Sequence, residues 1–218
     1  DDARAALYER VAQRKLVVPD TWEVQLSGGA DKKATFERLI AEGRLGYMAL
    51  LRNLRGMTGA GVDRKLITRA ILARKGAEKV FPFRFLSAAK AAPGFESVLD
   101  QAMLDGLAQE RKLPGTTVIV VDVSGSMYHT PVSRNSEITR IDAACSLAAI
   151  AREICEDPLV YATAGNDMKR IHATGLVPAR HGMALIEAIR DMPKILGGGG
   201  IFLKQVMEHI RALHGNID

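Results

Sequence analysis

The chain has 218 residues, of which 47% are hydrophobic and 25% charged, and its formal net charge is +5. These proportions are typical of a globular chain with one large or two small domains, and no apolar run reaches the roughly 20 residues of a membrane-spanning helix. The first residues lack the basic and then apolar order of a signal peptide. A cytoplasmic protein is therefore expected.

Positive charge is concentrated in the first half of the chain. Between Lys32 and Lys90 there are 14 cationic residues and only four acidic ones. Such a stretch is typical of a surface that faces nucleic-acid phosphates, but solvated helix faces also carry many lysines and arginines. The charge pattern alone leaves both interpretations open.

The first half is predicted to consist of short helices separated by glycine and proline breaks. Asp31 and Asp63 stand where helix N-caps are expected, and Gly43 and Gly76 follow expected helix ends. The predicted helical segments are 3–14, a short one at Trp22, 31–43, 45–57, 63–75, 81–91 and 95–110. A series of this kind predicts an α-helical repeat region, although the sequence shows no clear period.

The pattern changes near Leu113-Pro114-Gly115. Strands are expected at 116–123, 158–163 and 168–173, with a turn at 165–167, and helices at 138–156, 181–191 and 202–213. This alternation predicts half of a doubly wound α/β sheet, which ends at Asp218 where another strand should begin. Cys145 and Cys155 are expected in one helix, about 15 Å apart, as core residues that form no disulfide.

The most specific local motif is V-I-V-V-D-V-S-G-S-M at 118–127. Its apolar strand has no polar alternation, so both strand faces should be covered. The following loop carries Asp122, Ser124 and Ser126, whose oxygens suit Mg²⁺ in the spacing of a metal-ion-dependent adhesion site. The alternative is that Ser124 and Gly125 only turn the chain while Asp122 caps the next segment.

Four linked segments resemble the Ro family of RNA-binding proteins. They are WEVQLSGGADKKATFERLI (22–40), YMALLRNLRGM (47–57), FPFRFLSA (81–88) and VIVVDVSGSM (118–127). The resemblance implies the C-terminal part of a TROVE domain of HEAT-like helical repeats at 1–113, followed by the N-terminal half of a von Willebrand factor A-like domain at 114–218. It also implies that the chain is a fragment of a longer protein, lacking both ends.

The resemblance further implies a function in RNA binding. Ro proteins hold small noncoding RNAs such as Y RNA, together with single-stranded 3′ ends of misfolded RNAs, and they act in RNA quality control and stress responses. Some bacterial members work with an exoribonuclease. The same partners are expected here, with no membrane and no DNA.

Within this reading, RNA binding is mainly phosphate neutralisation by exposed cations. Arg52 and Arg55 lie three residues apart on one predicted helix, and the next helix could extend the strip. The five predicted RNA-binding residues are Arg52, Arg55, Arg64, Lys65 and Arg69. Four phenylalanines are expected in the core rather than in base stacking: Phe36, Phe81, Phe83 and Phe85.

Departures from the Ro pattern weaken the metal prediction. Gly200 stands where the family usually has a metal-coordinating threonine, and the aspartate of the third loop would lie beyond Asp218. Any Mg²⁺ is therefore expected to be weakly held or absent. No nucleophile, base and orienting residue can be assembled, which predicts a non-enzyme. The alternative function is a metal-dependent protein-interaction module without RNA binding.

Overall fold

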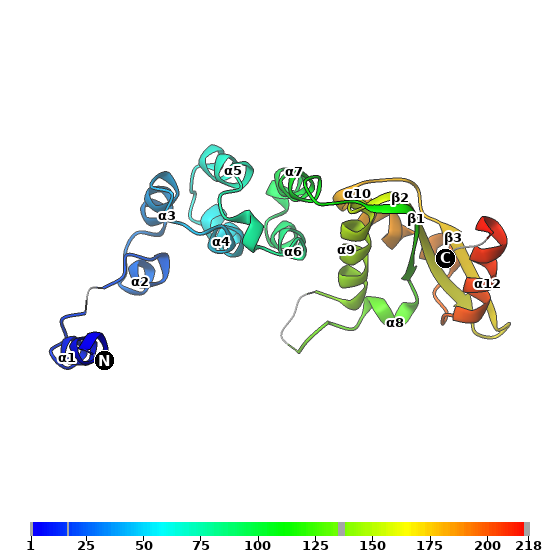
Figure 1. Ribbon diagram of the computed structural model, residues 1–218, viewed down its shortest axis with the longest axis horizontal. Coiled ribbons are helices and arrows are strands. Elements are labelled where there is room, and N and C mark those ends of the chain that lie inside the picture. Colours follow the sequence, from blue (N-terminus) through cyan, green and yellow to red (C-terminus); the bar gives the residue numbers. More distant parts are fainter. Residues whose placement is uncertain (1, 17, 135–137, 216–218) are drawn as a thin grey trace.

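The computed structural model describes residues 2–16, 18–134 and 138–215. Figure 1 shows an elongated molecule, with helices toward the N-terminus and a small sheet with its own helices toward the C-terminus. This confirms the predicted order of a helical region followed by a partial α/β region. Within the described ranges, none of the helices combines the length and the apolar character needed to cross a membrane.

The helical region is built from successive helices that alternate between two sides of the array. The helices are α1 (Asp2–Ala12), α2 (Trp22–Ser27), α3 (Lys32–Ala41), α4 (Tyr47–Gly59), α5 (Arg64–Leu72), α6 (Phe83–Ala91) and α7 (Glu96–Leu107), with 3₁₀ turns η1 (Ala77–Lys79) and η2 (Pro93–Phe95). In Figure 1, α3, α5 and α7 lie along one side and α2, α4 and α6 along the other. This alternation gives the repeat-like layout that the sequence period did not reveal.

Capping residues account for several of the helix starts. The Asp31 carboxylate accepts a hydrogen bond of 2.7 Å from the amide of Ala34, and the Asp63 carboxylate accepts one of 2.9 Å from the amide of Lys65. Two predicted ends are wrong: α4 continues through Gly59, and α5 stops at Leu72 instead of residue 75. Because α5 ends early, residues 73–82 form a connection that contains η1 and buries Ala77 and Val80 in the core.

The sheet contains strands in the order β1-β2-β3, with bounds β1 (Leu113–Asp122), β2 (Cys155–Asn166) and β3 (Ile171–Leu176). β1 and β2 are parallel, and β2 and β3 are antiparallel. β2 begins at Cys155, so the prediction that Cys155 shares a helix with Cys145 is wrong, although both cysteines are buried and free as expected. The predicted end of the sheet at Asp218 lies outside the described residues.

Helices cover both faces of the sheet, as the apolar strand predicted. They are α8 (Gly125–Tyr128), α9 (Arg140–Glu153), α10 (Gly182–Asp191), α11 (Pro193–Leu196) and α12 (Leu203–His214). Val121 packs in one core with residues of α9 and α10, whereas Val118 and Val120 pack against Val206 and Ile210 of α12. Figure 1 shows α9 and α12 on opposite sides of the strands.

A buried carboxylate joins the helical and α/β regions. The Asp142 side chain of α9 is only 5% exposed. Its Oδ1 accepts a hydrogen bond of 2.9 Å from Arg190 of α10, and its Oδ2 accepts one of 2.6 Å from the Thr139 hydroxyl and another from Lys90 of α6. Burial alone would raise the pKa of Asp142, but the hydrogen bonds from Lys90 and Thr139 lower it below its usual value. The carboxylate is therefore charged at neutral pH and links three helices.

A second polar contact joins α7 to α10. The Asp100 carboxylate accepts a hydrogen bond of 2.9 Å from the amide of Met183 in the first turn of α10. Gly182 has a φ of +52°, and a Cβ at that position would collide with Asp100 Oδ1. Met183 itself is buried in the core of the helical region. The regions therefore share apolar packing as well as polar contacts.

Candidate nucleic-acid interface and metal loop

Two of the five predicted RNA-binding residues form internal contacts near η2. The Nε of Arg55 donates to the carbonyl of Ala91 at 3.3 Å, and the guanidinium of Arg64 donates to the carbonyl of Gly94. Arg64 also lies 4.7 Å from the centre of the Phe95 ring. Arg55 and Arg64 thus help to attach the α4–α5 pair to the connection between α6 and α7, while both side chains remain exposed.

Arg52 lies in a different environment. It borders a groove of about 830 Å³ between α2, α4, the end of α5 and η1. The exposed cations Lys75 and Lys79 border the same groove, whereas Lys65 and Arg69 do not. Of the five predicted residues, the structure therefore places Arg55 and Arg64 at the connection around η2 and places Arg52 in a groove with three other cations, Arg44, Lys75 and Lys79.

Lys75 and Lys79 are the residues that the sequence reasoning missed. Both lie in the connection after α5, on either side of Gly76, whose φ of +86° requires glycine to turn the chain. The sequence KGAEK carried a usable signal, because it combines a helix break with two lysines inside the basic stretch. We did not consider these two lysines together because the predicted helix ran through Lys75 and so separated it from Lys79.

Among the described residues, no acidic side chain forms an ion pair with Arg52, Lys75 or Lys79. The groove also contains the carboxylates of Glu23 and Glu78. Unpaired cations on a groove wall are available for a polyanionic ligand at little electrostatic cost, since no internal ion pair has to break.

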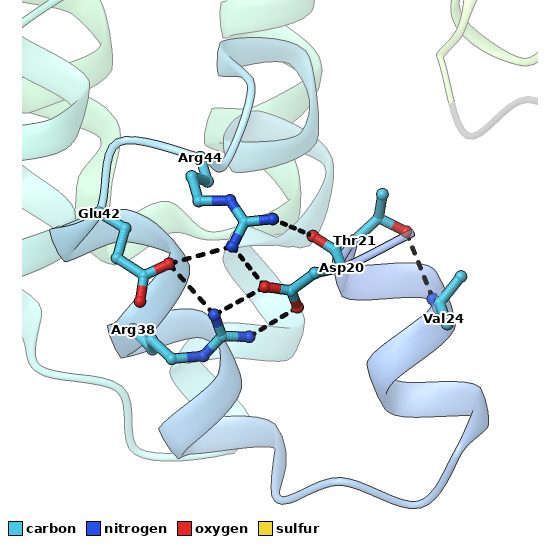
Figure 2. Close-up of polar contacts among 6 residues, drawn as sticks. All are labelled: Asp20, Thr21, Val24, Arg38, Glu42 and Arg44. Carbon is cyan, nitrogen blue, oxygen red and sulfur yellow. Dashed lines mark hydrogen bonds and ion pairs between the residues drawn. The ribbon is translucent and has the colours of Figure 1, made fainter. Parts of the chain in front are cut away.

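Arg38 and Arg44 are occupied by an ion-pair network instead (Figure 2). Arg38 binds both carboxylate oxygens of Asp20, at 2.8 and 2.9 Å, and also binds Glu42 at 3.1 Å. Arg44 contacts the same two acids and donates to the carbonyl of Asp20 at 3.1 Å. The hydrogen bond from Arg38, followed by that from Arg44, lowers the pKa of Asp20 to about 2. This network holds the segment before α2 against α3. It also neutralises the positive charge of two arginines.

The prediction that all four phenylalanines lie in the core is wrong for two of them. Phe36 and Phe85 are buried, but Phe81 is 70% exposed and Phe83 is 43% exposed. The reason is helical rotation: α6 begins at Phe83, and residues two positions apart on a helix point in very different directions. Phe85 therefore faces the core while Phe83 points outward, and Phe81 precedes the helix.

The predicted metal loop follows β1 and lies against the glycine loop. The hydroxyl oxygens of Ser124 and Ser126 are 3.3 Å apart, and Asp122 Oδ1 accepts a hydrogen bond of 2.8 Å from the amide of Ser124. The amide of Gly125 donates to the carbonyl of Gly198 at 2.9 Å. Asp122 therefore stabilises the turn, as the alternative interpretation predicted. The three predicted oxygen donors also lie in one short loop.

This donor set does not fit a tightly held metal. Mg²⁺ and Ca²⁺ sites draw on several oxygen ligands and usually more than one charge, whereas this loop offers a single carboxylate, one of whose oxygens already accepts from Ser124. In the part of the chain that the structure describes, no group of three histidine, cysteine or acidic residues could hold a metal.

The fold and the groove define a class of protein: a helical array with a cationic groove, joined to a partial α/β unit. Residues 6–175 match the sequence profile of the TROVE domain, so the chain belongs to the TROVE domain family. The match begins within α1 and ends within β3, so it includes most of the helical region and nearly all of the sheet.

Two curated relatives match a shorter stretch. Telomerase protein component 1 of Mus musculus is 36% identical over 96 residues, and its counterpart in Rattus norvegicus is 35% identical over 96 residues. Each match covers 41% of this chain and 4% of the relative. The chain therefore spans only a small part of the length of these relatives.

Proposed function

We propose that the chain is an RNA-binding scaffold that uses the groove bordered by Arg52, Lys75 and Lys79. The observation that carries the proposal is the convergence of these three cations in one groove, where none of them takes part in the ion-pair network of Asp20 that holds the neighbouring Arg44. Membership of the TROVE family and the resemblance to Ro proteins support the choice of RNA as the ligand.

The physical basis is the neutralisation of phosphate charge. Each cation that contacts a phosphate releases counterions, and for single strands the slope of log affinity against log salt is about −0.7 per contact. Three contacts give a slope of about −2, which corresponds to a loss of about 20-fold in affinity between about 50 and 200 mM salt. This electrostatic contribution to the affinity requires no base-specific contact.

The finer proposal follows the Ro pattern. The helix pairs are HEAT-like repeats, and the sheet is the first half of a von Willebrand factor A-like domain. The RNA partners are small noncoding RNAs of the Y type and single-stranded 3′ ends of misfolded RNAs, in cytoplasmic RNA quality control, with an exoribonuclease as a protein partner. The scaffold has no catalytic role of its own, and Mg²⁺ at Asp122, Ser124 and Ser126 is weakly held or absent.

Fluorescence anisotropy with a labelled single-stranded RNA tests the groove. The double variant Arg52→Ala/Lys79→Ala should weaken binding several-fold and reduce the salt slope by about 1.4, because two of three phosphate contacts are lost. A matched control, Lys204→Ala/Arg211→Ala, removes the same charge from the exposed surface of α12 and should leave the slope unchanged. Equal weakening by both double variants would show that only the net charge matters, and the groove would have to be abandoned.

A further inference from the structure

Two exposed aromatic rings lie side by side at the start of α6. The ring centres of Phe81 and Phe83 are 5.9 Å apart and the rings are inclined by only 12°, so they are stacked. The guanidinium of Arg84 lies 4.9 Å from the centre of the Phe83 ring. The result is a cluster of two stacked rings with a cation at one of them, exposed on the surface of the protein.

Packing does not explain this exposure. Phe85, two residues further on, is 2% exposed and lies in the core of the helical region, where its ring contacts Tyr47. Phe81 and Phe83 belong to no buried core cluster of the described residues. Two large apolar rings that stay in contact with water are unfavourable in isolation, and such surface features are typical of binding sites.

The aromatic pair lies next to the cationic groove. Phe81 borders a hollow of about 330 Å³ that is also lined by Lys79 and Arg74, and Lys79 borders the groove of Arg52 as well. Lys79 is thus shared by the groove and the hollow. Glu78 and Glu110 also border this hollow, so its two cations are matched there by two acids.

Phe83 and Arg84 face a second, larger hollow of about 930 Å³. Lys90 and Arg190 border it as well, but both are held by Asp142. Its other charged lining residues are acidic: Glu96, Glu187 and Asp191. A strand that leaves the groove at Lys79 and crosses Phe81 and Phe83 therefore reaches another cation, Arg84.

We propose that Phe81 and Phe83 form a stacking platform for unpaired nucleobases of an RNA strand whose phosphates follow Arg52, Lys75 and Lys79. This inference rests on the proposed function and names the part of the RNA that the site recognises: single-stranded bases, in any sequence. Exposed aromatic rings beside a cationic track are the arrangement by which proteins hold single strands, because every base has a flat π-face. Since the two rings already contact each other, a base stacks on the outer face of the pair.

An apolar peptide is the competing ligand for exposed rings. The cations at both ends of the pair favour RNA, because Lys79 and Arg84 would require acidic partners on a peptide, whereas phosphates accompany every base of a strand. Arg74 adds to this charge: its Nη1 is buried without a hydrogen-bond partner among the described residues, and the side chain lines the hollow of Phe81.

The test compares two labelled ten-nucleotide strands of equal charge, oligoadenylate and an abasic strand with the same phosphates. The wild-type chain should bind oligoadenylate about 5- to 150-fold more tightly than the abasic strand, which is the range for one stacked base. Phe81→Ala/Phe83→Ala should bind both strands equally, with the salt slope of the wild type. Phe81→Tyr/Phe83→Tyr should retain the preference, and Phe81→Leu/Phe83→Leu should lose it although the site stays apolar.

Each result decides between the proposals. A wild-type chain that binds both strands with equal affinity overturns the stacking platform while leaving phosphate binding in the groove intact. A wild-type chain that binds neither strand overturns the proposed function and the platform together. If Phe81→Ala/Phe83→Ala keeps the preference but changes a dimer to a monomer in light scattering, the rings are a protein interface and the inference is wrong. Leu213→Ala, which removes an exposed apolar side chain from α12, should change nothing.

Discussion

The buried carboxylate of Asp142 is expected to stabilise the junction between the helical and α/β regions. In Asp142→Ala, Lys90 and Arg190 lose their acidic partner, and Thr139 loses the side chain with which it forms a capping box at the start of α9. Removing one partner of a fully buried ion pair costs about 3–5 kcal/mol. Because the side chains of Lys90 and Arg190 are each 41% exposed, water can solvate them after the change, and we expect a smaller loss of about 2–3 kcal/mol.

Two milder variants separate the contributions. Asp142→Asn keeps a side-chain oxygen near Thr139 but removes the charge, so about 1–2 kcal/mol should be lost. Lys90→Met removes only the contact with α6 and should cost less than either change at Asp142, since the pair with Arg190 remains. Urea denaturation followed by circular dichroism gives the free energy of unfolding for each variant.

The pH dependence of stability supplies an independent check. The pKa of Asp142 is lower in the folded than in the unfolded chain, so its stabilisation is present above the unfolded value near 3.8 and is lost as the pH falls through the lower folded value. Subtracting the pH profile of Asp142→Asn from that of the wild type should isolate this acidic loss. If Asp142→Ala unfolds within about 0.5 kcal/mol of the wild type, the carboxylate contributes no net stability and the reasoning fails.

Two further predictions concern Asp20 and the metal loop. The Asp20 carboxyl should titrate at a pH of about 2 in carbon-detected NMR, and Arg38→Gln should move that pKa up toward 3.8; a wild-type value already near 3.8 would show that the network of Figure 2 does not persist in solution. Millimolar Mg²⁺ should leave the melting temperatures of the wild type and Asp122→Ala equally unchanged, because one carboxylate and two hydroxyls give too few charged ligands. A rise in melting temperature that depends on Asp122 would establish a working metal site.

Local chemistry made much of the architecture predictable. A capping aspartate satisfies backbone amides of the next turn whatever the rest of the chain does, so Asp31 and Asp63 identified their helices correctly. The unbroken apolar run of β1 likewise required cover on both faces, and α9 and α12 provide it. In both cases the residues that carry the pattern lie close to the structure that they predict. A capping aspartate acts on the next turn of its own helix, and an apolar strand contacts the helices packed directly on the sheet.

The candidate site could not be predicted in the same way, because it depends on how the helix pairs stack. Arg52 on α4 meets Lys75 and Lys79 only because the end of α5 and η1 lie beside the start of α4, where the Tyr47 hydroxyl donates to the carbonyl of Ile71 at 2.8 Å. The spacing of residues on one helix instead predicted that Arg52 and Arg55 act together. In the structure, Arg55 donates a hydrogen bond to the carbonyl of Ala91. No pattern in the sequence indicates which of these residues Arg52 lies near.

The connection between α5 and α6 therefore supplies part of the proposed RNA site, beside Arg52 on α4 and Phe83 at the start of α6. Lys75, Lys79 and Phe81 all lie between α5 and α6, where early termination of α5 frees the chain from helical packing. A residue on a helix face shares its orientation with the residues that pack the core, whereas a residue in a connection can turn outward without disturbing that core. Arg38, Arg44 and Arg64 of the helical array are held in internal contacts, whereas the proposed RNA site combines Arg52 and Phe83 of the helices with the lysines and Phe81 of the connection.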